Sequence, residues 1–106
     1  MEHYHVESVR DGAKSYAEFV RSRDLSAGVY RLAAGADDPQ KPHTEDEIYY
    51  VISGRSRFRG GDRDVGVVPG DVLFVPAGEE HRFYSIVEDL ELLVVFGPAE
   101  GSGKSK

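Results

Sequence analysis

The sequence contains no cysteine among its 106 residues. Disulfide bridges and thiolate metal ligands are therefore excluded, so any bound metal must be held by imidazole, carboxylate, amide or water. A chain without cysteine is compatible with export but is more typical of the reducing interior of the cell. We therefore expect an intracellular protein.

Long apolar runs and an excess of basic residues are absent as well. No stretch approaches the ~20 apolar residues that a membrane-spanning helix needs, and residues 1–6 lack the basic start and apolar run of a secretion signal. The 19 acidic residues outnumber the 13 basic ones and give a net charge of -6, which repels nucleic-acid phosphates. We expect a soluble cytoplasmic protein with neither a membrane nor a nucleic-acid partner.

Short runs typical of β-strands recur along the chain, without a helix of convincing length. Each run is rich in β-branched or aromatic residues and is bounded by Gly, Pro, Asp or Ser. The runs are Ala17–Val20, Ala27–Leu32, Ile48–Ile52, Ser56–Arg59, Val65–Val68, Val72–Val75, Arg82–Ile86 and Leu90–Phe96. The pattern predicts an all-β sandwich or barrel, while Val9–Tyr16 permits one helical turn without predicting it.

The length and the composition of the C-terminus predict one domain with a short tail. A chain of 106 residues has room for a single core, and we place the domain at residues 1–98. Residues 99–106 are mostly small, polar or charged, so they bury too little apolar area to offset the entropy of ordering. We expect this tail to be disordered.

Two segments place one glutamate and two histidines among glycines and prolines. The first runs from Gly35 to Gly54 and contains Lys41, His43 and Glu47; the second runs from Gly70 to Ser85 and contains Pro76, Gly78 and His81. On an unbroken strand His43 and Glu47 share a face, as does Glu45. If a barrel sets the two segments side by side, His81 joins them. Two imidazoles and one carboxylate suit Fe, Mn, Ni or Zn as a divalent ion and leave positions open for water or substrate.

The residues just before His43 decide whether the centre has a fourth protein ligand. The ammonium group of Lys41 is a poor ligand unless burial removes its proton. Gln40 offers an amide oxygen, and Pro42 can rotate the strand so that Gln40 points inward. We expect Gln40 as a fourth, weaker metal ligand, with a water molecule in that position as the alternative.

Aromatic side chains near these segments are candidates for the wall of a substrate pocket. Ligand sites in proteins usually have such apolar linings, although ordinary core packing is an alternative for each residue. The candidates are Tyr49, Phe58, Phe74 and Phe83. Arg55, Arg57 and Arg59 alternate and so share one strand face, which predicts a solvated edge if it faces outward and an anion site if it faces inward.

The two segments together resemble the paired motifs of the cupin superfamily, G-x5-H-x-H-x3-4-E-x6-G and G-x5-P-x-G-x2-H-x3-N. The match departs at Lys41, in place of the first histidine, and at Ser85, in place of the asparagine. The resemblance spans the last two thirds of the chain and implies a jelly-roll barrel, the double-stranded β-helix, with a metal near one mouth. Small single-domain cupins are often homodimers, so we expect one here, with Ala17–Val20 pairing to a partner's sheet edge.

The resemblance leaves two classes of function open, because cupins include dioxygenases, isomerases, decarboxylases and sugar-binding sensor domains. The first is a divalent-metal-dependent enzyme acting on a small organic molecule, dioxygenase- or isomerase-like, in which Tyr49 or Glu45 moves protons. The alternative is a non-catalytic module that binds a small, sugar-like molecule.

Overall fold

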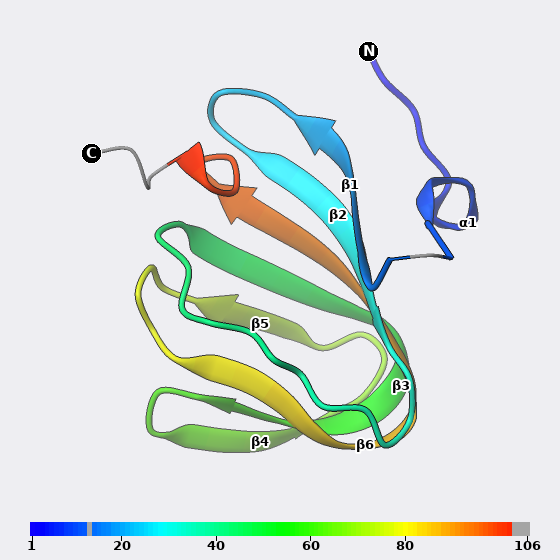
Figure 1. The fold of residues 1–106 in the computed structure, drawn as a ribbon, viewed down its shortest axis with the longest axis vertical. Helices are drawn as coiled ribbons and strands as arrows, with labels where there is room; N and C mark the ends of the chain where they lie inside the picture. The colour runs from blue at the N-terminus through cyan, green and yellow to red at the C-terminus, as the bar shows by residue number, and fades with distance from the viewer. Residues whose placement is uncertain (13, 103–106) are drawn as a thin grey trace.

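The computed structural model describes residues 1–12 and 14–102, and it confirms the predicted all-β fold. A single helical turn, α1, precedes six strands (Figure 1). The elements are α1 (Val6–Val9), β1 (Tyr16–Arg21), β2 (Ser26–Leu32), β3 (Asp46–Gly60), β4 (Arg63–Val67), β5 (Val72–Val75) and β6 (His81–Gly97). The sequence permits a helical turn within Val9–Tyr16, and in the structure the turn ends at Val9, where that segment begins.

The two longest strands, β3 and β6, pair antiparallel and belong to both layers of the barrel (Figure 1). The first half of β3 pairs with the end of β6 and with β5, and β2 and β1 extend this layer beyond β6. The second half of β3 pairs with the start of β6 and with β4. The two layers of the jelly roll are therefore joined by strands that pass from one layer to the other.

Because β3 and β6 each continue from one layer into the other, the structure has fewer and longer strands than the sequence predicts. Ile48–Ile52 and Ser56–Arg59 are parts of β3, and Arg82–Ile86 and Leu90–Phe96 are parts of β6. The β3–β6 register shifts three times between Val51 and Arg57, and such bulges bend a strand without ending it. Turn-like residues inside these segments therefore mark bends.

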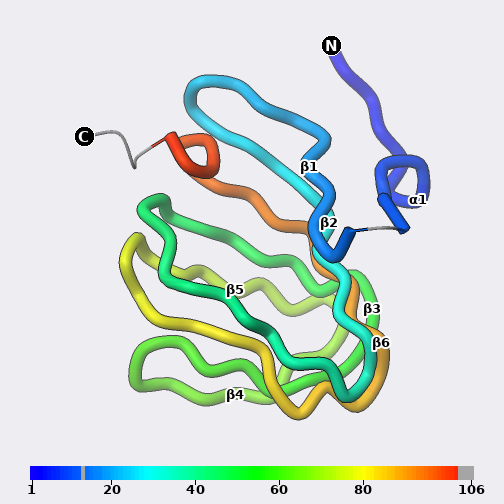
Figure 2. The backbone as a smooth tube through the Cα atoms, in the orientation of Figure 1, coloured from blue at the N-terminus to red at the C-terminus, as the bar shows by residue number. Residues whose placement is uncertain are grey.

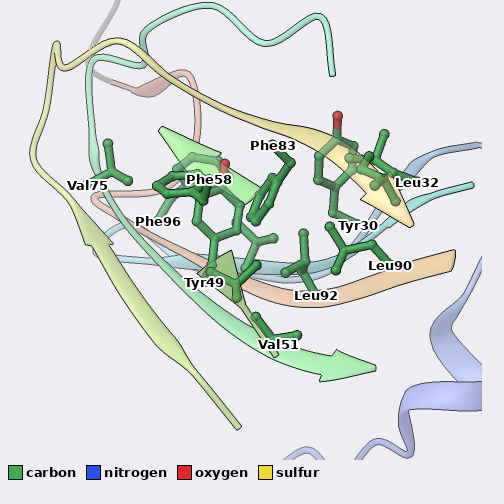
Figure 3. Packing of buried hydrophobic residues seen from close by; sticks show 13 residues of the cluster. Tyr30, Leu32, Tyr49, Val51, Phe58, Val75, Phe83, Leu90, Leu92 and Phe96 are labelled. Atoms are coloured by element: carbon green, nitrogen blue, oxygen red, sulfur yellow. The ribbon is translucent and has the colours of Figure 1, made fainter. Parts of the chain in front are cut away.

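The core lies between the layers and is rich in aromatic rings (Figure 3). Tyr49 and Phe83 are almost completely buried, and their ring centroids lie 5.1 Å apart in an edge-to-face arrangement. Phe58 packs against Phe83 at 4.6 Å. Alternate residues of β3 point into this core, as the period of two along a strand requires.

The loop between β2 and β3, residues 33–45, runs across the open side of the barrel toward the turn that follows β5 (Figure 2). The backbone N–H of Gly78 in that turn donates to the carbonyl of His43 at 2.7 Å. This bond ties the first motif segment to the second. Ser85, which stands where the motif has asparagine, has φ of 48°, a left-handed conformation that asparagine adopts more readily than most residues.

The first two residues of the expected tail, Ala99 and Glu100, are packed against the barrel. Ala99 is 2% exposed, and the N–H of Glu100 donates to the hydroxyl of Ser26 at 2.8 Å. The part of the tail prediction that concerns residues 103–106 lies outside the described residues. Within the described part of the chain, no helix is long and apolar enough to cross a membrane.

Gly54 and Gly70 provide a matched test of the bend in β3, because both have φ of 96°. A Cβ atom at Gly54 would lie 2.3 Å from the carbonyl oxygen of Asp89, whereas one at Gly70 would meet no atom within 4 Å. We predict that Gly70→Ala lowers the free energy of unfolding by about 1 kcal/mol through backbone strain alone. Gly54→Ala should lower it by about 3 kcal/mol, since overpacking is added. Urea denaturation measures both values, and equal losses would contradict the assigned role of Gly54.

Candidate metal centre

Three potential metal ligands converge from three separate elements. His43 comes from the loop before β3, Glu47 from the start of β3, and His81 from the start of β6. One ligand atom from each lies within 4.8 Å of the others. The Oε1 atom of Glu47 is 3.1 Å from Nε2 of His81 and 3.9 Å from Nε2 of His43. The structure therefore brings together the His-Glu-His group expected from the spacing.

The ring of His81 is oriented by the backbone. Its Nδ1 lies 3.0 Å from the carbonyl oxygen of Glu79, so Nδ1–H donates there and Nε2 faces Glu47. Burial by itself lowers the pKa of His81, but the neighbouring Glu47 carboxylate and the Glu79 carbonyl outweigh burial and raise it. The proton that this favours on Nε2 occupies the side of the ring where a metal ion would bind, so proton and metal compete for one position.

The buried Glu47 carboxylate fits a divalent cation. Its Oε1 atom is inaccessible to solvent and receives no well-formed hydrogen bond from the described residues. An isolated buried carboxylate is costly unless a cation or hydrogen-bond donors compensate it. An ion held by Glu47, His43 and His81 would supply that compensation, with nitrogen and oxygen ligands suited to Fe, Mn, Ni or Zn.

Gln40 points toward this centre, while Lys41 is exposed. The Oε1 atom of Gln40 lies 3.3 Å from Nε2 of His43 and accepts a hydrogen bond from the hydroxyl of Tyr49 at 2.9 Å. The Tyr49 hydroxyl is also 3.1 Å from Nε2 of His81. Gln40 thus faces the centre in preference to Lys41, and a ligand role for Gln40 stays a prediction.

Asp38 orients Gln40, and sequence reasoning missed it. The Oδ2 atom of Asp38 accepts from Nε2 of Gln40 and from the N–H of Phe83, each at 2.9 Å. Its Oδ1 atom accepts from the hydroxyl of Tyr30 at 2.6 Å. With Nε2 of Gln40 engaged, Oε1 faces the histidines. The pair Asp37-Asp38 before a proline resembles an ordinary loop, and the one signal in the sequence was the spacing of two residues from Asp38 to Gln40.

Three of the four expected aromatics lie near the centre, and of these three Tyr49 alone lines the adjoining cavity, whereas Phe58 and Phe83 are core residues. Tyr49 and Phe58 have ring centroids 6.0 Å and 6.2 Å from the His81 ring, and Phe83 packs on both. Phe74 is not brought to this group. It is 61% exposed on the outer face of β5, because the neighbouring Val75 is the residue that faces the core.

The alternating arginines of β3 face outward, as expected for a solvated edge. Arg57 and Arg59 each donate to the carboxylate of Asp64, at 2.9 Å and 3.0 Å. A hydrogen bond from the hydroxyl of Tyr84, together with the two guanidinium groups, lowers the pKa of Asp64 to about 2. Both arginines are therefore engaged by a surface carboxylate.

The chain belongs to the cupin family, since residues 28–96 match the model of the cupin domain. The matched segment holds every member of the His-Glu-His group. The fold agrees with the crystal structure of TT1209 from Thermus thermophilus, which has a TM-score of 0.74 and 27% identity and covers 93% of this chain and 99% of that one. The class of protein defined by fold and site is therefore a small cupin.

Three curated proteins are similar to this chain over half of its length or more. An uncharacterised protein of Streptomyces coelicolor is 48% identical over 88% of this chain and 87% of its own length. The oxalate-binding protein of Thermotoga maritima is 39% identical over 52% of this chain and 46% of that protein. The acireductone dioxygenase of Exiguobacterium sibiricum is 33% identical over 50% of this chain and 32% of that enzyme. The match thus covers less than half the length of the last two proteins.

Asp38 and Asp37 allow a test of the network around Gln40. Asp38 is 6% exposed and accepts three hydrogen bonds, whereas Asp37 is exposed. We predict that Asp38→Asn lowers the free energy of unfolding by about 2 kcal/mol, because an amide nitrogen replaces one acceptor oxygen and leaves a buried donor unpaired. Asp37→Asn should change it by less than about 0.5 kcal/mol. Thermal and urea unfolding of both variants would contradict the network if the two changes were equal.

Proposed function

We propose that this protein is a cytoplasmic, divalent-metal-dependent enzyme acting on a small organic molecule, with dioxygenase- or isomerase-like chemistry. The observation that supports it is the buried group of His43, Glu47 and His81 beside a cavity of about 150 Å³. Two histidines and one carboxylate leave coordination positions open for a substrate. The likeness to an acireductone dioxygenase over half of the chain adds support.

A bound divalent ion would polarise a substrate carbonyl or enol or activate O2. The chain's own residues then hold and orient the substrate. Aromatic rings on one side of the centre keep bulk water out, which strengthens electrostatic interactions there. Burial and the charge of Glu47 raise the pKa of Tyr49, so its phenol stays protonated and donates to the amide oxygen of Gln40, which holds that oxygen at the centre.

A second candidate is a binding module without turnover, supported by the likeness to an oxalate-binding protein. A surface depression of about 350 Å³ beside His81 is lined by Lys41, Arg59 and Arg82 together with the acidic Glu80. The excess of positive charge in this wall attracts small anions. The two candidates differ in one measurement, because the module would bind a small molecule to the metal-loaded protein and return it unchanged.

Removing a metal ligand tests the centre directly. We predict that protein purified without chelators carries about one divalent ion per chain. Glu47→Gln and His81→Ala should each weaken metal affinity by more than about 100-fold, beyond what changes outside the ligand set cause. His3→Ala is the control, because His3 is exposed and lies near the N-terminus, outside the ligand set, and this variant should keep the metal. Elemental analysis after dialysis decides; a wild type that binds no divalent ion would sink the proposal.

Measurements of oxygen uptake and of products with candidate enols and diketones then distinguish a metal-dependent enzyme from a non-catalytic binding module. Turnover that disappears in His81→Ala supports the enzyme. Tight binding of oxalate, returned unchanged, supports the module.

We also propose that the protein is a homodimer. The outer face of β3 and β5 exposes four large apolar side chains at 42% to 64%, which cross-strand pairing places side by side. They are Ile48, Tyr50, Val72 and Phe74. Contiguous apolar patches on soluble proteins commonly mark interfaces. The edge strand β1 of the same sheet also has one side unpaired, which supports the expected pairing through Ala17–Val20.

Phe74 and Val87 give a matched test of the face, since their exposed fractions are 61% and 68% and Val87 lies in the bend of β6. We predict that Phe74→Asp produces a monomer, because it places a charge within the apolar contact. Val87→Asp should leave the dimer intact. Sedimentation velocity measures the species; a wild-type monomer, or equal behaviour of the two variants, would contradict the proposed face.

A further inference from the structure

The cavity beside the metal centre has a wall that the family motifs do not supply. It is lined by Tyr16, Tyr30, Gln40, His43, Glu47, Tyr49, Val94, Phe96 and Glu100. Tyr16 and Glu100 lie outside the residues 28–96 that match the cupin domain. Both ends of the chain therefore contribute to the cavity.

The two end segments are held in place by specific contacts. Nη2 of Arg21, at the end of β1, donates to the carbonyl oxygen of Glu100 at 2.7 Å. The N–H of Glu100 donates to the hydroxyl of Ser26 at 2.8 Å. These bonds join the C-terminal segment to β1 and β2, so the wall formed by Tyr16 and Glu100 is part of the folded barrel.

Gly28 creates the space that the phenol of Tyr16 occupies. A Cβ atom at Gly28 would lie 2.4 Å from both Cζ and the hydroxyl oxygen of Tyr16. The ring is also held edge-on against Tyr30 and Phe96, with centroids 6.3 Å and 6.4 Å away. The phenol of Tyr16 is therefore fixed with its polar end inside the protein.

The hydroxyl of Tyr16 differs from those of the other tyrosines in the cavity wall. The hydroxyl of Tyr30 donates to Asp38, and that of Tyr49 donates to Gln40. The Tyr16 hydroxyl is buried and has no hydrogen-bond partner among the described residues. A buried polar group without a partner costs stability, and such groups in native proteins call for a partner outside the chain.

The surroundings keep this phenol protonated. Burial raises the pKa of Tyr16, and the carboxylates of Glu100, Glu18 and Glu47 raise it further. A protonated phenol donates its hydrogen to an acceptor. The partner is therefore expected to be an acceptor oxygen close to His43 and Glu47.

We propose that Tyr16 is a ligand-binding residue whose hydroxyl donates a hydrogen bond to an oxygen atom of the small molecule that occupies this cavity. The inference rests on the proposed function, in which the small molecule binds at the metal centre. The cavity volume of about 150 Å³ admits a compact ligand. The carboxylates of Glu47 and Glu100 in the wall repel multiply charged anions, so we expect a ligand that carries at most one negative charge, with two neighbouring oxygen atoms, one for the metal and one for Tyr16.

Acetohydroxamate is a suitable probe, because it is small, has two adjacent oxygen donors and binds divalent metals that have open positions. Calorimetric titration of manganese-loaded protein gives its affinity. We expect Tyr16→Phe to weaken binding about tenfold, as loss of one hydrogen bond to a charged acceptor does. Tyr4→Phe, which removes an exposed hydroxyl in the segment before α1, should leave the affinity unchanged.

The melting temperature of the ligand-free, metal-loaded protein is the second readout. Removing an unpartnered hydroxyl should leave it unchanged or raise it in Tyr16→Phe. A fall of several degrees would overturn the inference, because the phenol would then have a structural partner such as a bound water. Equal probe affinity in wild type and Tyr16→Phe would also overturn it while leaving the proposed function intact. Failure of the wild type to retain manganese, iron, nickel and zinc alike would instead contradict the proposed function, and Tyr16 would lose its role with it.

Discussion

The carboxylate of Glu47 is the constraint around which the rest of the site is arranged. It lies in an aromatic interior, 2% exposed, where an uncompensated charge is expensive. The side chains closest to this carboxylate that can carry positive charge are the imidazoles of His43 and His81. Neither histidine pairs with Glu47 across neighbouring strands, where its partner on β6 is Phe96. The loop before β3 has to deliver His43, and the start of β6 has to deliver His81. The path of both segments follows from that requirement.

The long strands β3 and β6 make this delivery possible. Glu47 lies in the half of β3 that pairs with the end of β6, whereas His81 begins the half of β6 that pairs with the end of β3. The two residues are therefore far apart along their shared ladder and meet only because both strands bend. The left-handed backbone of Gly54, pressed against Asp89, is one of the positions at which that bend is built.

Much of the fold and of the site follows from the local sequence pattern. The features that the pattern does not predict share one cause, which is that they depend on contacts distant in sequence or on which face of a strand is buried. Spacing predicted His43, Glu47 and His81, because turns at fixed offsets determine where those side chains emerge. The same reasoning divided β3 and β6 into shorter strands, because a bulge and a loop use similar residues. It placed Phe74 in the pocket wall because composition does not reveal which face of a short strand is inward. Asp38, Tyr16 and Glu100 acquire their roles through contacts distant in sequence, which no local pattern encodes.

The His-Glu-His group lies within the matched cupin domain, whereas Tyr16 and Glu100 lie outside it and line the adjoining cavity. Mutations at these two positions can therefore reshape what the cavity accepts while the His-Glu-His group stays where it is. Divergence of substrate among proteins that share this barrel requires no rebuilding of its interior. The segments on either side of the matched cupin domain are the part of this chain where selectivity can change at low structural risk.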